Sequence, residues 1–437
     1  GHTQAAAGVA GVMKMVLAMR NGLLPQTLHI DTPSTHVDWT DGDIQLLTEH
    51  TPWPETGAPH RAGVSSFGLS GTNAHVIIEQ APETPEAKQQ PKPVPSPVAV
   101  PWVLSGKSET ALRAQAGKLL DRVRQDTDTS LTDIGYSLAL TRTHFDHRAA
   151  ITATHRDDYL TALEALTHNH PTTSTTTAET QTSPRPVFVF PGQGAQWTGM
   201  AVGLLDSSPV FAARMAECAA ALDPYVEWSL LDVARGAEGA PGLDRVDVVQ
   251  PVLWAVMVSL AEVWRSYGVE PAAVIGHSQG EIAAAAVAGI LSLDDAAKVV
   301  ALRSRAITAL AGRGGMVSVA QPATWVREKI TTWGGRISIA AVNGPSSVVV
   351  SGDPKALDEL VTDCRANEIR ARKIDVDYAS HSAHVEEIET ELARLLAGIA
   401  PQPGGTPLYS SLTGTLLDGT EMGAGYWYNN LRETVEF

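Results

Sequence analysis

The stretch AAVIGHSQGEIAAAAVAG, residues 272–289, places an apolar strand, a short turn and an alanine-rich helix in direct succession. The spacing Gly276-x-Ser278-x-Gly280 is typical of a sharp strand-to-helix turn that projects the serine hydroxyl, with the helix N-terminus facing any negative charge that develops there. We therefore predict an α/β fold with Ser278 as a nucleophile. The alternative is a turn without chemical function, because the pattern is common by chance.

A second apolar strand ends in a glycine-rich turn at FVFPGQGAQWTGM, residues 188–200. A nucleophilic serine needs N–H donors that stabilise the oxyanion. We expect these from the backbone of Gln193, in this turn, and of Gln279, the residue after Ser278. A phosphate-binding loop is the competing interpretation, but no Gly-Lys-Ser/Thr follows the glycines.

Two histidines provide candidates for the general base. His381 and His384 lie in VDYASHSAHVE, after the alternating stretch IDVDY (residues 374–378), which predicts a strand, and before a predicted helix. Two histidines three residues apart could also bind a metal, but no third ligand stands nearby and we expect no metal. Either histidine could instead only pack or cap.

Composition excludes several classes of partner. Lys and Arg number 32 and Asp and Glu 48, a formal charge of −16, which disfavours nucleic-acid binding. Cys218 and Cys364 are too few for a disulfide framework or a zinc site, which fits a cytoplasmic protein. No apolar run is expected to reach the roughly 20 residues of a membrane helix; residues 5–19 come closest, and we expect no membrane partner.

Changes in composition divide the chain into three segments. Prolines concentrated between Pro82 and Pro101 predict an extended linker, and the threonine tract PTTSTTTAETQTSPRP, residues 171–186, predicts an exposed connection. Between them, VPWVLSG and RAAITAT are typical of strands, whereas ETALRAQAGKLLDRVR and LTDIGYSLAL favour helices. From Val187 onward, apolar strands alternate with glycine-rich turns and helices.

Six motifs in the last segment, in this order, resemble the acyltransferase domain of a modular type I polyketide synthase: FPGQGAQWTGM, VDVVQPVLWAV, GHSQGEIAAA, ALRSRAI, AVNGPSSVVVSG and YASHSAHVE. Upstream, GHTQAAAGVAGVMKMVLAM and RAGVSSFGLSGTNAHVIIE resemble the end of a ketosynthase domain. The resemblance implies a thiolase-like ketosynthase remnant at 1–85, a small α/β linker domain at 86–185 and an acyltransferase at 186–437.

The resemblance also implies roles for individual residues. Ser278 would be the nucleophile and His381 the general base and acid, which leaves the second histidine a bystander. Arg303, in ALRSRAI, would bind the free carboxylate of the substrate, a role that suits a planar guanidinium; without the resemblance it would be an ordinary helix residue. Asp375 and Asp377 are excluded as third members of a catalytic triad, because the resemblance implies a Ser–His pair that is oriented mainly by backbone carbonyls.

The implied reaction is transfer of an acyl group from coenzyme A to Ser278, and then to the phosphopantetheine thiol of an acyl carrier protein, with no permanently bound cofactor. YASH, rather than HAFH, resembles the set that takes methylmalonyl-CoA. Ser380 in place of phenylalanine leaves volume for a methyl branch, which contributes roughly 1–3 kcal/mol of discrimination. We expect selectivity to be spread over Tyr378, Ser380 and Gln279, which could alternatively serve only to pack the subdomains together.

The implied fold is an α/β-hydrolase-like large subdomain with a ferredoxin-like small subdomain inserted at about 315–376. MVSVA, RISIAAV and SSVVVSG are typical of strands, and ATWVREKITTW and PKALDELVTDCRAN of helices. We expect the active site in the cleft between the two subdomains.

The two ends of the chain suggest truncation. His2 lies in a stretch that resembles a loop carrying one ketosynthase histidine, so we expect it to be a relic without condensation activity, and the acyltransferase would continue past Phe437. In a full module the partners would include the parent ketosynthase dimer. Three alternatives remain open: a malonyl-specific acyltransferase, a serine hydrolase, and a non-catalytic structural fragment.

Overall fold

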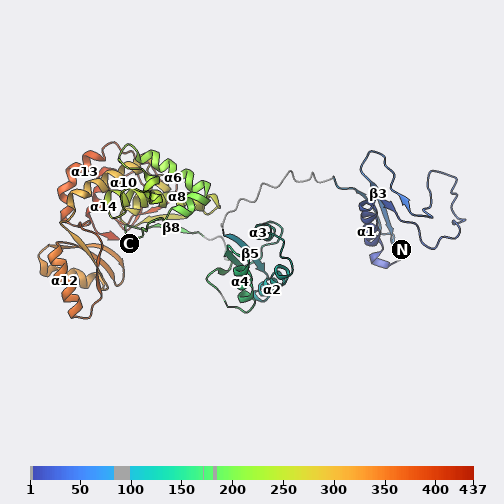
Figure 1. The fold of residues 1–437 in the computed structure, drawn as a ribbon, viewed down its shortest axis with the longest axis horizontal. Coiled ribbons are helices and arrows are strands. Elements are labelled where there is room, and N and C mark those ends of the chain that lie inside the picture. Colours follow the sequence, from blue (N-terminus) through green and yellow to red (C-terminus); the bar gives the residue numbers. More distant parts are fainter. Residues whose placement is uncertain (1–2, 83–98, 171, 181–184) are drawn as a thin grey trace. The chain divides into compact units, whose positions relative to one another are not determined.

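The computed structural model describes residues 3–82, 99–170, 172–180 and 185–437, and the chain divides into two compact units, residues 1–95 and 96–437 (Figure 1). His2 lies outside the described residues, as does most of the proline-rich stretch that was predicted to be an extended linker. The six motifs that resemble an acyltransferase all fall within the second unit.

The described part of the first unit contains a short 3₁₀-helix, one α-helix and two small antiparallel sheets. Its elements are η1 (Gln4–Ala6), α1 (Ala7–Arg20), β1 (Leu23–Leu24), β2 (Thr51–Pro52), β3 (Arg61–Phe67) and β4 (Asn73–Glu79). Helix α1 packs on the β3–β4 hairpin, where a Cβ at Gly11 would lie 2.9 Å from Val64. Among its described residues only Ala18 and Met19 are fully buried, so this unit has very little core of its own.

Residues 100–179 form a small α/β domain. Its strands β5 (Val100–Gly106), β6 (His147–Ala153) and β7 (Thr175–Glu179) pair antiparallel in that order, with helices α2 (Glu109–Gln125), α3 (Leu131–Leu140) and α4 (Arg156–Thr167). Trp102 and Tyr159 stack in its core. The threonine tract, predicted as an exposed connection, instead supplies β7; its β-branched side chains suit a strand, and β6 satisfies its backbone.

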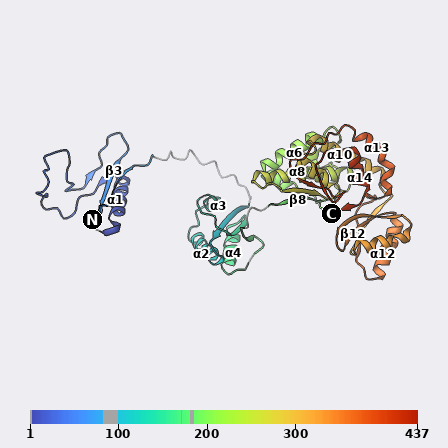
Figure 2. The same ribbon diagram turned by 180° about the vertical axis from the view of Figure 1, so that it is seen from behind.

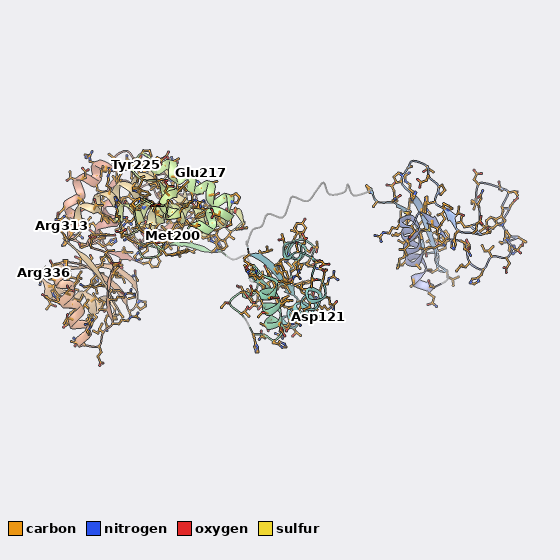
Figure 3. All side chains as sticks on the ribbon, viewed as in Figure 1. Asp121, Met200, Glu217, Tyr225, Arg313 and Arg336 are labelled. Atoms are coloured by element: carbon orange, nitrogen blue, oxygen red, sulfur yellow. The ribbon has the colours of Figure 1, made fainter. Side chains whose placement is uncertain are left out.

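The large subdomain is a sheet of order β15-β14-β9-β8 packed among helices. Strands β8 (Val187–Phe190), β9 (Ala273–Gly276) and β14 (Leu408–Tyr409) are parallel, and β15 (Leu416–Leu417) is antiparallel to β14. The helices are α5 (Val202–Ser207), α6 (Pro209–Leu222), α7 (Leu230–Arg235), α8 (Val246–Ser266), α9 (Gly280–Ala288), α10 (Leu293–Ile307), η2 (Thr308–Leu310), η4 (Ala383–Ile388), α13 (Glu389–Leu395) and α14 (Ala424–Arg432). Figure 3 labels Glu217 and Tyr225 among these helices.

Helix α8 is the core helix of this subdomain. It has 21 residues and a mean hydropathy of 1.6 in its most apolar window, so by length and composition it could cross a membrane, and the expectation of no such run was wrong. However, 78% of that window is buried inside the protein, including Trp254. Its apolar character is therefore accounted for by packing against α6, α9 and α10.

The small subdomain, which contains the β12 and α12 labelled in Figure 2, has a sheet of order β13-β10-β12-β11-β16. Its elements are β10 (Gly315–Val319), α11 (Ala323–Ile330), η3 (Thr331–Trp333), β11 (Ile337–Gly344), β12 (Ser347–Gly352), α12 (Pro354–Ala366) and β13 (Ala371–Ile374). Up to β13 this is the predicted ferredoxin-like βαββαβ arrangement. The strand predicted at 374–378 is wrong: β13 ends at Ile374, and the chain then turns back towards the large subdomain. A short late strand, β16 (Val435–Glu436), pairs parallel to β11.

Candidate active site

Ser278 lies in the turn between β9 and α9, with a backbone φ of 52°. The flanking glycines make this turn possible, because a Cβ at Gly276 would lie 2.2 Å from the backbone of Glu281, and one at Gly280 would lie 2.2 Å from the carbonyl oxygen of Phe190. The second contact also brings the end of β8 against the turn. The serine is thus held in a strained, projecting conformation.

His381, the expected general base, lies on the segment that returns from the small subdomain. Its Nε2 lies 2.9 Å from Ser278 Oγ, across 103 residues of sequence, and its Nδ1 lies 2.7 Å from the backbone oxygen of Glu433. Since that oxygen only accepts, Nδ1 carries the proton and Nε2 is left as an acceptor. Burial lowers the pKa of His381 to about 3, so the imidazole is neutral at pH 7.

The two expected oxyanion donors lie beside Ser278. Gln279 begins the turn into α9, and the loop carrying Gln193 packs on the same turn, where a Cβ at Gly192 would lie 3.0 Å from His277. In the described residues, neither backbone N–H donates a hydrogen bond to another protein group. Both N–H groups are therefore available to a ligand.

Arg303, on α10, is fully buried and lines the same cavity as Ser278 and His381. Its Nη1 donates to Gln250 Oε1 and its Nη2 to Asn430 Oδ1, each at 3.1 Å, and its Nε has no partner among the described residues. Burial lowers its pKa to about 10, which still leaves the guanidinium charged at pH 7. A buried cation whose protein partners are neutral amides is suited to bind an anionic ligand.

Ser278, His381 and Arg303 all line one cavity of about 110 Å³. Its polar side includes the three residues expected to govern selectivity, Gln279, Tyr378 and Ser380, and the Tyr378 hydroxyl donates to Gln193 Oε1 at 2.8 Å. The apolar wall is contributed by the small subdomain and was not anticipated from the sequence. It consists of Met316, Ala341, Val349, Ile374 and Val376.

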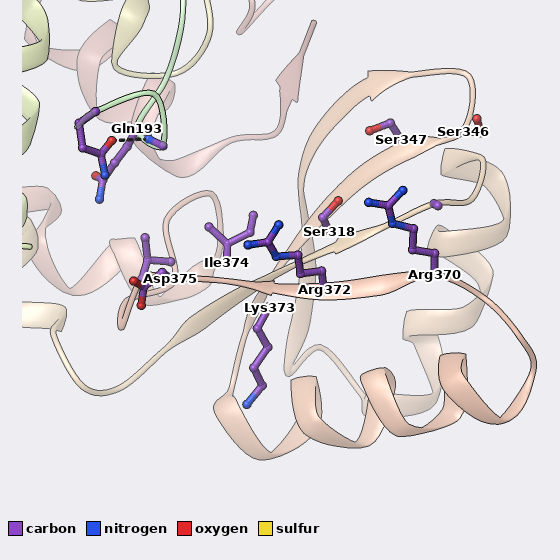
Figure 4. Close-up of a pocket in the computed structure, with 13 residues that line it drawn as sticks. Gln193, Ser318, Ser346, Ser347, Arg370, Arg372, Lys373, Ile374 and Asp375 are labelled. Atoms are coloured by element: carbon purple, nitrogen blue, oxygen red, sulfur yellow. Dashed lines mark hydrogen bonds between the residues drawn. The ribbon is translucent and has the colours of Figure 1, made fainter. Parts of the chain in front are cut away.

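An outer groove of about 610 Å³ adjoins this cavity and shares Gln193, Ile374 and Val376 with it (Figure 4). Arg372, in β13, and Arg370, the residue just before this strand, both line the groove. The Lys373 side chain extends to the opposite face, where it pairs with Asp358. The groove is thus basic in a chain of net charge −16.

Residues 187–437 match the family model described as the acyl transferase domain. The chain belongs to this acyltransferase family. Residues 33–151 match the ketoacyl-synthetase C-terminal extension, and residues 1–31 the C-terminal domain of beta-ketoacyl synthase. The predicted α/β acyltransferase fold and the order of a ketosynthase fragment, a linker and an acyltransferase are confirmed, whereas the boundaries at 85 and 185 stay predictions.

Relatives of this acyltransferase are modular polyketide synthases. Polyketide synthase GfsA of Streptomyces halstedii is 57% identical over 436 residues, and mycoketide-CoA synthase of Mycobacterium tuberculosis is 56% identical over 437. Both alignments cover 100% of this chain, which spans only 6% and 10% of those proteins. The acyltransferase domain from module 8 of the salinomycin polyketide synthase is 57% identical, with a TM-score of 0.75 over 78% of this chain and 82% of that chain.

The acyltransferase site also contains polar residues that sequence reasoning missed. Gln250 and Asn430 hold Arg303, the Glu433 carbonyl orients His381, and the fully buried Glu281 bonds to Asn430 Nδ2 at 2.8 Å. Gln250 had one usable signal, a polar residue within an apolar helical run. His384 and the excluded Asp375 and Asp377 do not contact the Ser–His pair: His384 lies in η4, Asp375 lines the outer groove, and Asp377 accepts from the Gly312 N–H.

Glu281 should make the stability of the acyltransferase depend on pH. Burial raises its pKa to about 7 from 4.5, so the folded state binds more protons than the unfolded state between these values. Relative to Glu281→Gln, the wild-type free energy of unfolding is expected to fall as the pH rises from 4.5 to 7. Urea unfolding of both proteins over this range measures the difference; a constant difference would contradict the expectation.

Proposed function

We propose that this acyltransferase takes an extender unit from its coenzyme A thioester and passes it, through Ser278, to the phosphopantetheine thiol of an acyl carrier protein. The observation that carries the proposal is the 2.9 Å Ser278–His381 pair in a cavity that is also lined by the buried cation Arg303. We also propose that the domain works together with the parent ketosynthase dimer of a full module, in the cytoplasm.

The proposed chemistry uses one serine twice. His381 Nε2 takes the Ser278 proton as Oγ attacks the thioester carbonyl, and the Gln193 and Gln279 N–H groups stabilise the oxyanion. The C–S bond breaks, and the coenzyme A thiolate receives the proton from His381. In the second half, His381 takes the proton of the carrier's thiol, the sulfur attacks the acyl-serine, and the C–O bond breaks as Ser278 regains its proton.

Arg303 favours donors that carry a free carboxylate. A donor without one would leave the buried guanidinium unpaired, which costs more than an exposed cation would. We propose methylmalonyl over malonyl, because the small Ser380 beside His381 leaves room for a methyl branch and the opposite wall is apolar. Tyr378 and Gln279 complete the boundary of that space.

The test is intact-protein mass spectrometry after brief incubation with methylmalonyl-, malonyl- or acetyl-CoA. The proposal expects a methylmalonyl-sized adduct on Ser278, less malonyl adduct and no acetyl adduct. Equal malonyl and methylmalonyl loading would overturn the methyl preference. Acetyl loading at the same rate would overturn the role of Arg303, and the absence of any adduct on folded protein would overturn the function. Release of free acid faster than transfer to the carrier would indicate a hydrolase instead.

The outer groove supports a phosphate-bearing donor, because Arg370 and Arg372 lie beside the cavity without an ion pair among the described residues. We expect Arg370→Ala/Arg372→Ala to raise KM for a coenzyme A thioester about tenfold or more, since hydrogen bonds to charged groups contribute about 1.5–3 kcal/mol each. Steady-state transfer kinetics provide the measurement.

Two controls make this expectation specific. The N-acetylcysteamine thioester of the same acyl group lacks phosphates, so the double variant should process it as the wild type does. Lys373→Ala changes a cation on the opposite face of the same strand and should leave KM unchanged. A double variant that loses both donors equally would contradict a phosphate-binding role for the groove.

A further inference from the structure

We propose that Glu281 and Asn430 form a positioning pair that holds a neutral amide oxygen, rather than a carboxylate, against Arg303, and thereby keeps the guanidinium charge available for a carboxylated donor. The inference rests on the proposed function of Arg303. It assigns roles to two buried residues that take no part in the chemical steps themselves.

The geometry places Asn430 between the two buried charged groups of the site. Asn430, on α14, is 3% exposed; its Oδ1 accepts from Arg303 Nη2 at 3.1 Å and its Nδ2 donates to Glu281 Oε2 at 2.8 Å. The same Nδ2 lies 3.4 Å from the Ser278 carbonyl oxygen. One side-chain amide thus contacts the carboxylate-binding group, a buried acid and the nucleophile turn.

Donor and acceptor chemistry leaves this amide one orientation. A guanidinium can only donate, and an ionised carboxylate can only accept. An amide bonded to both must present its oxygen to Arg303 and its NH₂ to Glu281. On its other side, Glu281 accepts from Ser411 Oγ at 3.1 Å and from the Tyr426 hydroxyl, which fixes the carboxylate in the position that faces Asn430.

This arrangement separates the two opposite charges. Direct contact between Glu281 and Arg303 would form a buried ion pair, and a substrate carboxylate would then have to compete with it. With the amide interposed, the hydrogen-bond partners of the guanidinium are Gln250 and Asn430, both neutral. Asn430 therefore holds Arg303 in place without neutralising it.

The decisive variant is Asn430→Asp, which keeps the size of the side chain but places a carboxylate on Arg303. At pH 8, we expect its kcat/KM ratio for methylmalonyl-CoA over acetyl-CoA to fall at least tenfold. Glu281→Gln is the matched control, since a glutamine oxygen can still accept from Asn430 Nδ2; its ratio should stay within threefold of wild type. In the double variant Glu281→Gln/Asn430→Asp, the glutamine NH₂ can donate to the carboxylate introduced at position 430. Its melting temperature should therefore be higher than that of Asn430→Asp, while its kcat/KM ratio stays low.

Three results would overturn the inference. The ratio for Asn430→Asp could remain within twofold of wild type. Both donors could lose activity equally in step with lost stability, which is what a purely structural role predicts. Glu281→Gln could lower the ratio as much as Asn430→Asp, which would mean that the charge of Glu281, and not the orientation of the amide, matters.

A binding measurement separates this inference from the proposed function. Calorimetry with free methylmalonate reports whether Arg303 can accept a carboxylate, whether or not acyl transfer occurs. We expect wild type and Glu281→Gln to bind it, and Asn430→Asp to bind at least tenfold more weakly. If wild type loads no thioester but this pattern holds, the acyl-transfer function fails and the inference stands. If wild type loads methylmalonyl but Asn430→Asp binds methylmalonate as wild type does, only the inference fails.

Discussion

Ser278→Ala is expected to lower kcat/KM for acyl transfer roughly 10⁴-fold or more and to abolish the covalent acyl adduct, because removal of the nucleophile leaves only binding and oxyanion stabilisation. We expect Ser278→Ala to keep the wild-type fold. Serine and alanine bear the same penalty at a φ of 52°, and the flanking glycines that permit the turn are unchanged.

Intact-protein mass spectrometry and transfer to a carrier protein measure this loss. Ser318→Ala is a suitable control, because it removes a hydroxyl from the outer groove and not from the catalytic cavity. If Ser278→Ala still formed an adduct at the wild-type rate, the nucleophile would be another residue. A non-catalytic fragment would show no difference between wild type and the variant.

His381→Ala is expected to lower kcat/KM about 10³-fold or more, since in the proposed mechanism it removes both the base that activates Ser278 and the acid that protonates the leaving thiol. His384→Ala provides a matched control from the same segment. His384 lies three residues on and does not contact Ser278, so its loss should change the rate less than threefold.

The kinetic signature of His381→Ala should differ from that of unfolding. In the proposed function, Arg303 and the groove bind the substrate, so we expect KM to change little while kcat falls. Circular dichroism and the melting temperature test whether the fold is intact. Equal losses in the two histidine variants would contradict the assignment of His381 as the base.

The sequence was most informative where chemistry depends on a local backbone shape. GHSQG predicted the turn at Ser278, because glycines flanking a serine between an apolar strand and a helix have few other uses. The same logic led to Gln193 and Gln279 as oxyanion donors, a role that stays a prediction. The pairing with His381 needed the family resemblance, since no local pattern reports a contact across 103 residues.

Other parts of the site could not be found from local sequence. The group that orients His381 is the backbone carbonyl of Glu433, which any residue could supply. Glu281 stood inside the quoted motif, but its burial depends on Tyr426, Ser411 and Asn430, which lie more than 100 residues downstream. The threonine tract was misassigned for a related reason: a polar strand is recognisable only once its partner β6 is known.

The short strand β16 has a mechanical consequence. The chain crosses between the subdomains near residues 311–315 and 374–378, and two such crossings alone would act as a hinge. The pairing of β16 with β11 adds a third tether, directly after the Glu433 carbonyl that orients His381. Swinging the small subdomain away would break this ladder and misalign the base. Under the proposed function, we therefore expect substrates to exchange through the outer groove while Ser278 and His381 stay paired.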